Sequence, residues 1–398
     1  MNRVSANARS TAKGVTGPLA TAAAYIALCA TIGVQMPFFP LFLTARGLGP
    51  EAVGLAIAMP MAIRLFAMPL AGIVSDKSGA PRALLAVLGL ASAAAFALMG
   101  LVQGTAAILL AVGLAAVVWS PAYTLLDSYT VQLAKRRAVD YGRSRLWGSA
   151  SFVAANLAVG YLLNFASPGA VIWLIAGPCL SFALAARFLP ALAHPEHEMR
   201  LPIARRPKVL LLGVAAAALV QASHALLYAF SSLQWTAQGL TPGVVGLLWS
   251  LGTIAEIVLF FAGTKLVRKI PALRLIALGG FAATLRFGAF ALDPPASSIA
   301  LLQLLHAFSF GATHLGLMAL IADHVPGRQA GRAQTYASAV LGLVMAAATI
   351  AAGPLYVRWG AAAYGWFAAL AAIGGLLALS GRAQPHKAGT GGEISAPL

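Results

Sequence analysis

The sequence has few charged residues. Only 9% of its 398 residues are Asp, Glu, Lys or Arg, where about 25% is usual for a soluble domain. A water-soluble fold of this size could not cover its surface with so few charges, and 60% of the residues are apolar. A soluble enzyme is therefore excluded, and lipid is the solvent for most of the chain.

Patterns that bind metals or nucleotides are also lacking. The two cysteines, Cys29 and Cys179, lie far apart in apolar runs and indicate neither a metal site nor a disulfide framework. No HExxH pattern predicts a metal, and no nucleotide-binding loop is present. We therefore expect no cofactor and no ATP-driven pumping by this chain. A membrane-embedded enzyme or a receptor stays a remote alternative, since it would need a catalytic cluster or a soluble domain.

The sequence instead contains long apolar runs. A helix that spans about 30 Å of hydrocarbon needs about 20 apolar residues, and no run alternates as the strands of a membrane barrel would. The predicted fold class is an all-α membrane protein with twelve transmembrane helices in two parallel six-helix repeats. The predicted spans are 18–44, 52–74, 82–103, 105–132, 145–165, 168–190, 208–232, 243–266, 272–292, 297–322, 333–355 and 359–380.

Basic residues are distributed unevenly between the two sides of these spans. With the N-terminus taken as cytoplasmic, 23 of the 27 Lys and Arg residues fall in inner segments, and only Arg46 and Arg358 fall in outer loops. This is a strong positive-inside pattern, so the net charge of +17 reports topology and nucleic-acid binding is not expected. We expect a monomeric, multi-pass protein of a bacterial inner membrane, with both termini cytoplasmic. Its expected partners are the lipid bilayer, a small-molecule substrate and protons.

The chain repeats itself at an offset of 192 residues. Residues 47–55 (GLGPEAVGL) recur as 239–247 (GLTPGVVGL), and each copy leads into an inward-running helix. Parallel six-helix repeats of this kind place a binding site at mid-membrane between the halves. The predicted segments are an N-terminal tail 1–17, a first half 18–190, a cytoplasmic linker 191–207, a second half 208–380 and a disordered cytoplasmic tail 381–398.

Several motifs resemble those of known transporters. Residues 72–82 (GIVSDKSGAPR) resemble the signature loop of the major facilitator superfamily. Five motifs over helices five to ten resemble the phenylpropionate permease branch of that superfamily, which is related to sugar and nucleoside proton symporters. They are 140–149 (DYGRSRLWGS), 221–228 (QASHALLY), 248–256 (LWSLGTIAE), 286–288 (RFG) and 305–314 (LHAFSFGATH). The resemblance implies a secondary transporter that works by alternating access.

Three ionisable residues inside the spans are candidates for proton coupling, because each is costly in lipid. Glu256 lies near the centre of the eighth span, where low dielectric favours a neutral carboxyl group; a permanent structural ion pair is the alternative. His306 and His314 lie eight residues apart on roughly one face of the tenth span. They could shuttle protons, and hydrogen bonds between helices are the alternative.

Two arginines also lie inside spans. Arg64 holds the position in the second span that the repeat equates with Glu256, and Arg286 lies in the ninth span. A guanidinium group keeps its charge and presents a planar fork to carboxylates. Both arginines are therefore candidates for substrate binding. Arg286 could instead bias the proton affinity of Glu256 or make a structural pair.

Four residues of the seventh and eighth spans are further candidates for substrate binding. They are Gln221, His224, Tyr228 and Trp249. Gln221 and His224 are three residues apart and share a helix face, from which they could hydrogen-bond a ligand. The rings of Tyr228 and Trp249 suit a flat apolar ligand. Interhelical hydrogen bonds and ordinary packing are the alternatives.

Five charged residues are predicted to form an inner gate. They are Asp76, Arg82, Asp127, Arg143 and Arg145. An Asp at a helix end can pair with Arg or with a helix N-terminus across the two halves and so hold the gate shut. Asp127, toward the inner end of the fourth span, is expected to pair with Arg143 or Arg145 rather than to contact substrate.

These features predict a transporter and not an enzyme. The favoured function is proton-coupled symport of a small organic, preferably aromatic, carboxylate. Proton symport of a neutral sugar or nucleoside is the alternative. Antiport is disfavoured because the fifth span lacks the Gly-Pro element of drug-antiporter relatives.

The charge distribution generates a prediction about topology. Reporter fusions after Lys13, Arg200 and Gly381 should all report a cytoplasmic location, because basic segments stay on the cytoplasmic side. Activity of a cytoplasmic reporter against that of a periplasmic one measures this. A periplasmic signal at any of the three positions contradicts the twelve-helix assignment.

Overall fold

The structure is a computed structural model that describes residues 4–192 and 208–381. Within these ranges every regular element is helical, and helix occupies each of the twelve predicted spans. The predicted linker beyond residue 192 and the predicted tail beyond residue 381 lie outside the described residues. The first helix begins at Val4, inside the predicted N-terminal tail, and continues through Pro18.

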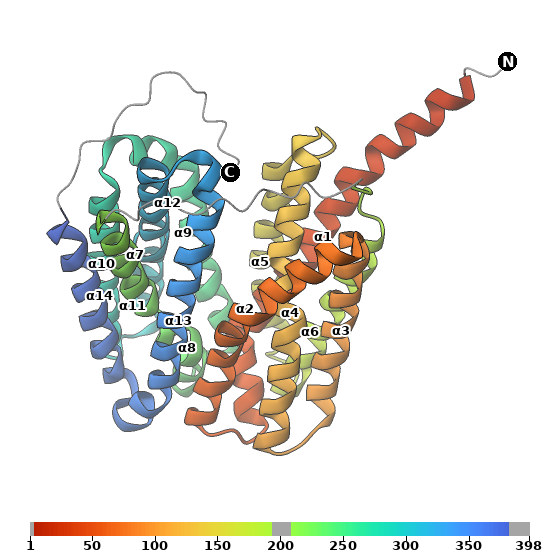
Figure 1. Ribbon diagram of the computed structural model, residues 1–398. Helices are drawn as coiled ribbons and strands as arrows, with labels where there is room; N and C mark the ends of the chain where they lie inside the picture. The colour runs from red at the N-terminus through yellow and green to blue at the C-terminus, as the bar shows by residue number, and fades with distance from the viewer. Residues whose placement is uncertain (1–3, 193–207, 382–398) are drawn as a thin grey trace. The chain divides into compact units, whose positions relative to one another are not determined.

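Figure 1 shows the helices in chain order, coloured from red at the N-terminus to blue at the C-terminus. The first six are α1 Val4–Ala45, α2 Pro50–Ser78, α3 Pro81–Leu101, α4 Thr105–Lys135, α5 Tyr141–Leu162 and α6 Val171–Arg187. The later ones are α7 Lys208–Ala222, α8 Ala225–Ala237, α9 Pro242–Lys269, α10 Ala272–Phe290, α11 Ala296–Leu304, α12 Thr313–His324, α13 Gly327–Trp359 and α14 Tyr364–Ser380. The seventh span is thus divided into α7 and α8, and the tenth into α11 and α12.

Ten stretches of the described residues are long and apolar enough to cross a membrane. One of them, Gln329–Ser380, contains both α13 and α14. Helix α5 is not among the ten, because polar residues such as Arg143 and Arg145 near its start lower its hydropathy. Hydropathy therefore supports eleven of the twelve predicted spans. The remaining span, α5, is supported by its place between α4 and α6 and by its packing against α1.

The described residues form two compact units. Residues before 48 and from 63 to 192 make the first unit; residues 48–62 and 208–381 make the second. The first part of α2 thus groups with the second unit. A Cβ atom added at Gly54 of α2 would lie 3.1 Å from the carbonyl oxygen of Thr349 in α13, so the two backbones approach closely there.

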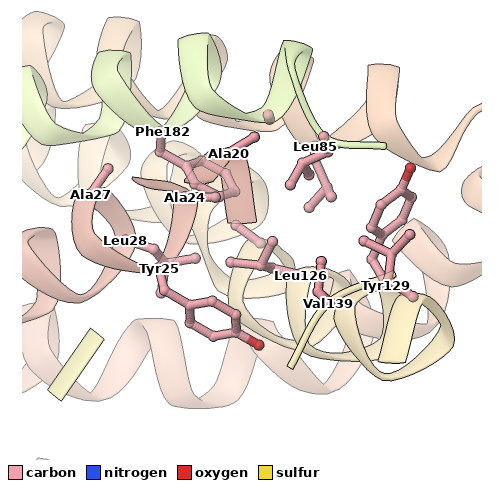
Figure 2. Packing of buried hydrophobic residues seen from close by; sticks show 14 residues of the cluster. Ala20, Ala24, Tyr25, Ala27, Leu28, Leu85, Leu126, Tyr129, Val139 and Phe182 are labelled. Atoms are coloured by element: carbon pink, nitrogen blue, oxygen red, sulfur yellow. The ribbon is translucent and has the colours of Figure 1, made fainter. Parts of the chain in front are cut away.

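In the first unit, α1 packs against α5 and α6, and α3 packs against α4 and α6. Figure 2 shows one buried cluster, where Leu28 and Tyr25 of α1 lie with Leu126 of α4 and Phe182 of α6. Small residues allow the close contacts. A Cβ atom added at Gly148 of α5 would lie 2.8 Å from the sulfur of Cys29 in α1. Such contacts are typical of helices that associate in lipid.

The sequence repeat is also a repeat of backbone conformation. Gly47 after α1 and Gly239 after α8 have φ of 84° and 88°, a left-handed conformation that favours glycine. The N–H of Gly47 donates to the carbonyl of Thr44, and that of Gly239 donates to the carbonyl of Thr236. Both copies therefore end a helix with the same turn and begin the next at a proline, as glycine and proline commonly do.

In the second unit, α10 crosses α14 where glycine faces glycine. A Cβ atom added at Gly280 of α10 would lie 2.6 Å from the Cα atom of Gly375 and 3.0 Å from the carbonyl oxygen of Ala371. Backbone atoms cannot move aside as the end of a flexible side chain can. The crossing fixes the position of α10, which carries Arg286.

We predict that Gly280→Ala lowers the free energy of unfolding by about 1–3 kcal/mol, the usual cost of overpacking. The matched control is Gly288→Ala on the same helix, where no heavy atom lies within 4 Å of the new Cβ. This control should be neutral, or more stable by up to about 1 kcal/mol through helix propensity. Denaturant unfolding in detergent measures both. Equal midpoints for the two variants would contradict the close crossing.

Candidate functional site

Two helices of the second unit are interrupted in the middle of their spans. The seventh span breaks at Ser223 and His224, between α7 and α8. The tenth span contains a π-helical turn, Ala307–Ala312, between α11 and α12. Single π-helical turns are frequent at functional sites, and substrate sites in transporters are typically formed by discontinuous helices. The two interruptions mark the candidate site.

Side chains join the two interruptions to each other. His224 is fully buried, and its Nε2 atom lies 3.0 Å from the hydroxyl of Ser309 in the π-helical turn. The side-chain amide of Gln221 donates to the carbonyl of Phe310 in the same turn, at 3.4 Å. The Nδ1 atom of His224 lies 3.2 Å from the carbonyl oxygens of Val220 and Gln221. Since carbonyls only accept, Nδ1 carries the hydrogen, and Nε2 accepts from Ser309.

Arg286 of α10 is the buried cation of this site. It is 1% exposed, and its guanidinium group donates to three neutral acceptors. Nη1 lies 3.0 Å from Nδ1 of His306 and 3.3 Å from the hydroxyl of Ser309, while Nη2 donates to the side-chain oxygen of Gln303. Its Nε atom has no hydrogen-bond partner among the described residues. Phe287 is adjacent, its ring centre 5.5 Å from the guanidinium carbon.

His306 connects Arg286 to Glu256. The Nε2 atom of His306 lies 3.4 Å from Oε2 of Glu256 in α9, and both side chains are largely buried. Because a guanidinium group only donates, Nδ1 of His306 must accept from Arg286. The hydrogen of the neutral imidazole is then on Nε2, facing the carboxyl group. Arginine, histidine and glutamate therefore form one directed chain across three spans.

Aromatic rings flank this chain in two stacks. In one, the ring of Tyr228 stacks on His224 and on Trp249, with centroids 5.8 Å and 6.0 Å apart. In the other, the ring of Phe310 stacks on His306 at 5.2 Å and on His314 at 6.4 Å. The indole N–H of Trp249 donates to the hydroxyl of Ser232 at 3.0 Å. The structure thus brings all the candidates of the seventh to tenth spans into one cluster.

A second polar cluster lies in the first unit. Asp127 of α4 and Arg145 of α5 form an ion pair of 2.9 Å. The hydroxyl of Tyr25 donates to the other carboxylate oxygen, and Arg145 also donates to the hydroxyl of Tyr141 at 3.1 Å. Tyr123 completes the cluster, its ring centre 5.5 Å from the guanidinium carbon. Of the two predicted partners of Asp127, the structure therefore selects Arg145.

The remaining candidates of the first unit lie outside this cluster. Arg143 is exposed, and its backbone N–H is bound by Asp140, which caps α5. Arg82 donates to the carbonyl of Leu189 beyond α6, at 3.2 Å. Arg64 and Asp76 of α2 are both exposed. No side-chain hydrogen bond or ion pair links either of them to another residue of 4–192 or 208–381.

Two site residues were not predicted from the sequence, Gln303 and Ser309. Both are buried and both bind the guanidinium group of Arg286. A sequence signal exists, since they lie three residues before and three after His306, a spacing that puts side chains on one helix face. Neutral polar residues cost less in lipid than charged ones, so they did not stand out from the apolar run.

Comparisons with known proteins agree with this architecture. Residues 19–368 match the model of the MFS_1 like family. The probable 3-phenylpropionic acid transporter of Escherichia coli (strain K12) is 31% identical over 86% of this chain and 91% of its own length. Maltose permease of Geobacillus stearothermophilus is 27% identical over 89% of this chain and 92% of its own length.

Two solved structures share the fold at low sequence identity. The nucleoside transporter NupG is 14% identical, with a TM-score of 0.78, over 91% of this chain and 98% of that one. A D-xylose-proton symporter is 15% identical, with a TM-score of 0.68, over 94% and 98% of the two chains. The resemblance predicted from the sequence motifs and the all-α membrane fold are both confirmed.

Proposed function

Because the chain belongs to the MFS_1 like family and is therefore a membrane transporter, not an enzyme, we propose that it is a proton-coupled symporter of a small aromatic carboxylate. Transport proceeds by alternating access, in the inner membrane of a bacterium, with both termini cytoplasmic and the monomer as the working unit. The observation that carries the proposal is the link from Arg286 to Glu256 through His306.

The charge of this link depends on one proton. When Glu256 is ionised, its negative charge balances that of Arg286. When Glu256 is protonated, one positive charge remains in a region of low dielectric, where an unpaired ion costs several kcal/mol. A carboxylate cargo removes that imbalance. Binding of a proton and binding of an anion then favour each other, which is the reciprocal coupling that symport requires.

The histidines supply a route for the proton. His306 holds its Nε2 hydrogen toward Glu256. It passes this proton to the carboxylate when Nδ1 gives up its hydrogen bond from Arg286 and takes up another proton. His314 is stacked in line through Phe310, on the same side of the tenth span. We assign proton coupling to Glu256, His306 and His314, since imidazole changes charge near physiological pH.

The proposed cargo contacts are two aromatic rings, two polar side chains and two arginines. Tyr228 and Trp249 offer aromatic faces to a flat ring, and Gln221 and His224 offer polar groups at the helix interruption. Arg64 and Arg286 supply the positive charge for a carboxylate. The name of the relative from Escherichia coli, a transporter of an aryl-substituted acid, supports this cargo class.

The polar cluster around Asp127 in the first unit and the charged residues where α2 meets α3 serve as the inner gate. Asp127 and Arg145 are already paired within their unit, while Asp76 is exposed and available to a partner. Arg82 and Arg143 lie at the ends of their helices, where charges act on helix dipoles. Rearrangement of these pairs accompanies the change between outward-facing and inward-facing states.

A neutral sugar or nucleoside is the second candidate cargo. Maltose permease is a relative, and the two structures with the same fold carry names of nucleoside and D-xylose transporters. Such a cargo has no net charge, so the buried cation would contribute far less to its binding.

We predict that Glu256→Gln abolishes uphill accumulation driven by a proton gradient, while substrate binding is retained. The amide imitates the protonated carboxyl group permanently, so no proton is carried. Proteoliposomes with an imposed pH gradient measure accumulation. Glu51→Gln, at an exposed site in the first turn of α2, is the matched control and should accumulate substrate as the native protein does. Normal accumulation by Glu256→Gln removes this residue from the mechanism.

We also predict that Arg286→Gln weakens binding of 3-phenylpropionate at least tenfold, about 1.4 kcal/mol. Binding of the uncharged amide analogue, 3-phenylpropanamide, should change much less. For the native protein, affinity for the acid should rise as the pH is lowered from neutral toward about 6, because protonation of Glu256 leaves the cation unbalanced. Calorimetry or competition binding on purified protein measures each affinity.

The control for Arg286→Gln is Arg274→Gln, an exposed arginine on the same helix. It should bind both compounds as the native protein does, and retained binding of the amide by Arg286→Gln shows that this variant is folded. If the native protein binds acid and amide equally, without pH dependence, the carboxylate proposal fails and the neutral cargo takes its place.

A further inference from the structure

Gln303, near the end of α11, has a buried side-chain amide whose oxygen and nitrogen both form hydrogen bonds. Its side chain is 1% exposed. Its oxygen accepts from Nη2 of Arg286, and its nitrogen donates to the carbonyl of Leu248 in α9, at 2.8 Å. Since Leu248 offers only an acceptor and Arg286 only donors, the amide has a single orientation. Gln303 therefore ties the guanidinium group to the backbone of α9.

All three groups that accept hydrogen bonds from Arg286 are uncharged. They are the Gln303 amide, the Ser309 hydroxyl and Nδ1 of His306. Buried arginines more commonly meet a carboxylate, which binds the guanidinium group bidentately. A glutamate at 303 would have nearly the same shape, but its second oxygen would face the Leu248 carbonyl without a hydrogen between them. The amide suits both neighbours and leaves the positive charge unbalanced.

The titratable groups around Arg286 are few. His306 contacts it directly, and His224 is joined to it through Ser309. The rings of Tyr228 of α8 and Tyr364 of α14 lie beyond these, Tyr228 stacked on His224 and Tyr364 stacked on Phe287. Glu256 is reached through His306, and His314 stacks on the Phe310 ring beside it. Among these described groups, Glu256 is the sole carboxylate.

We propose that Gln303 is a positioning residue that holds Arg286 without a carboxylate among its direct acceptors, so that the proton on Glu256 alone decides whether the site accepts an anion. The proposal rests on the proposed function above. A carboxylate at 303 would neutralise Arg286 permanently and remove the response to Glu256. An apolar residue at 303 would remove the support but leave the charge unbalanced.

A pair of variants separates charge from packing. Gln303→Glu changes charge at nearly constant shape, and Gln303→Met keeps the length while removing both hydrogen bonds. Binding of 3-phenylpropionate and of its amide is measured against pH for both variants and for the native protein. Unfolding in detergent and binding of the amide report on folding. We expect Gln303→Glu to bind the acid at least tenfold more weakly, with affinity nearly constant over a pH range in which the native protein responds.

Gln303→Met is expected to keep both the preference for the acid and its rise at lower pH, although the affinity itself falls. A Gln303→Glu variant with the native pH response overturns the proposal. So does loss of the pH response in both variants, because packing would then explain it. A native protein without acid preference or pH response refutes the proposed function and this inference together, which distinguishes that failure from a failure of Gln303 alone.

Discussion

A guanidinium group inside a helix bundle that crosses lipid must have its charge and its donors accommodated by the protein. Arg286 imposes this requirement on the second unit. Its three acceptors lie in α11, in the π-helical turn and, for His306, directly before that turn. Through His306 and Ser309, Arg286 is linked to Glu256 and His224. The interruption of the seventh span and the π-helical turn of the tenth both lie on this network. The close crossing of α10 and α14 holds the helix that carries the cation.

The two units differ in how an arginine is linked to an acidic residue. In the first, Arg145 meets Asp127 directly at 2.9 Å, and tyrosine hydroxyls occupy the remaining positions. In a direct pair, removing one charge strands the other. In the second, an imidazole separates Arg286 from Glu256. The intervening ring keeps the guanidinium group and the carboxyl group out of direct contact. The proposed function assigns the gate to the direct pair and proton coupling to the separated one.

The sequence was sufficient to predict an all-α membrane fold, because the length of an apolar span is set by the thickness of the bilayer. It also contained the repeat of 47–55 at 239–247, and both copies begin with a glycine in the left-handed conformation. Residues 48–62, within the predicted first half, group with the second unit by their contacts, and hydropathy says nothing about which helix a span packs against. Ionisable residues such as Arg286 were visible as costly exceptions in apolar runs. Gln303 was not, because its contacts depend on a backbone carbonyl of another helix. The π-helical turn was not visible either, because no particular residue type marks the one residue that it inserts.

The π-helical turn has a consequence for how the tenth span can be compared and altered. An α-helix rotates about 100° per residue, so His306 and His314, eight residues apart, would point about 80° away from each other on a regular helix. The wider turn absorbs one residue of that spacing, and both rings stack on Phe310. Deleting one residue between 307 and 312 would restore a regular α-helix and leave α12 in nearly the same rotational register. A homologous chain with a spacing of seven would thus present the same two imidazoles. A single-residue gap in an alignment at this place would then mark a change in winding, with both rings still on one side of the helix.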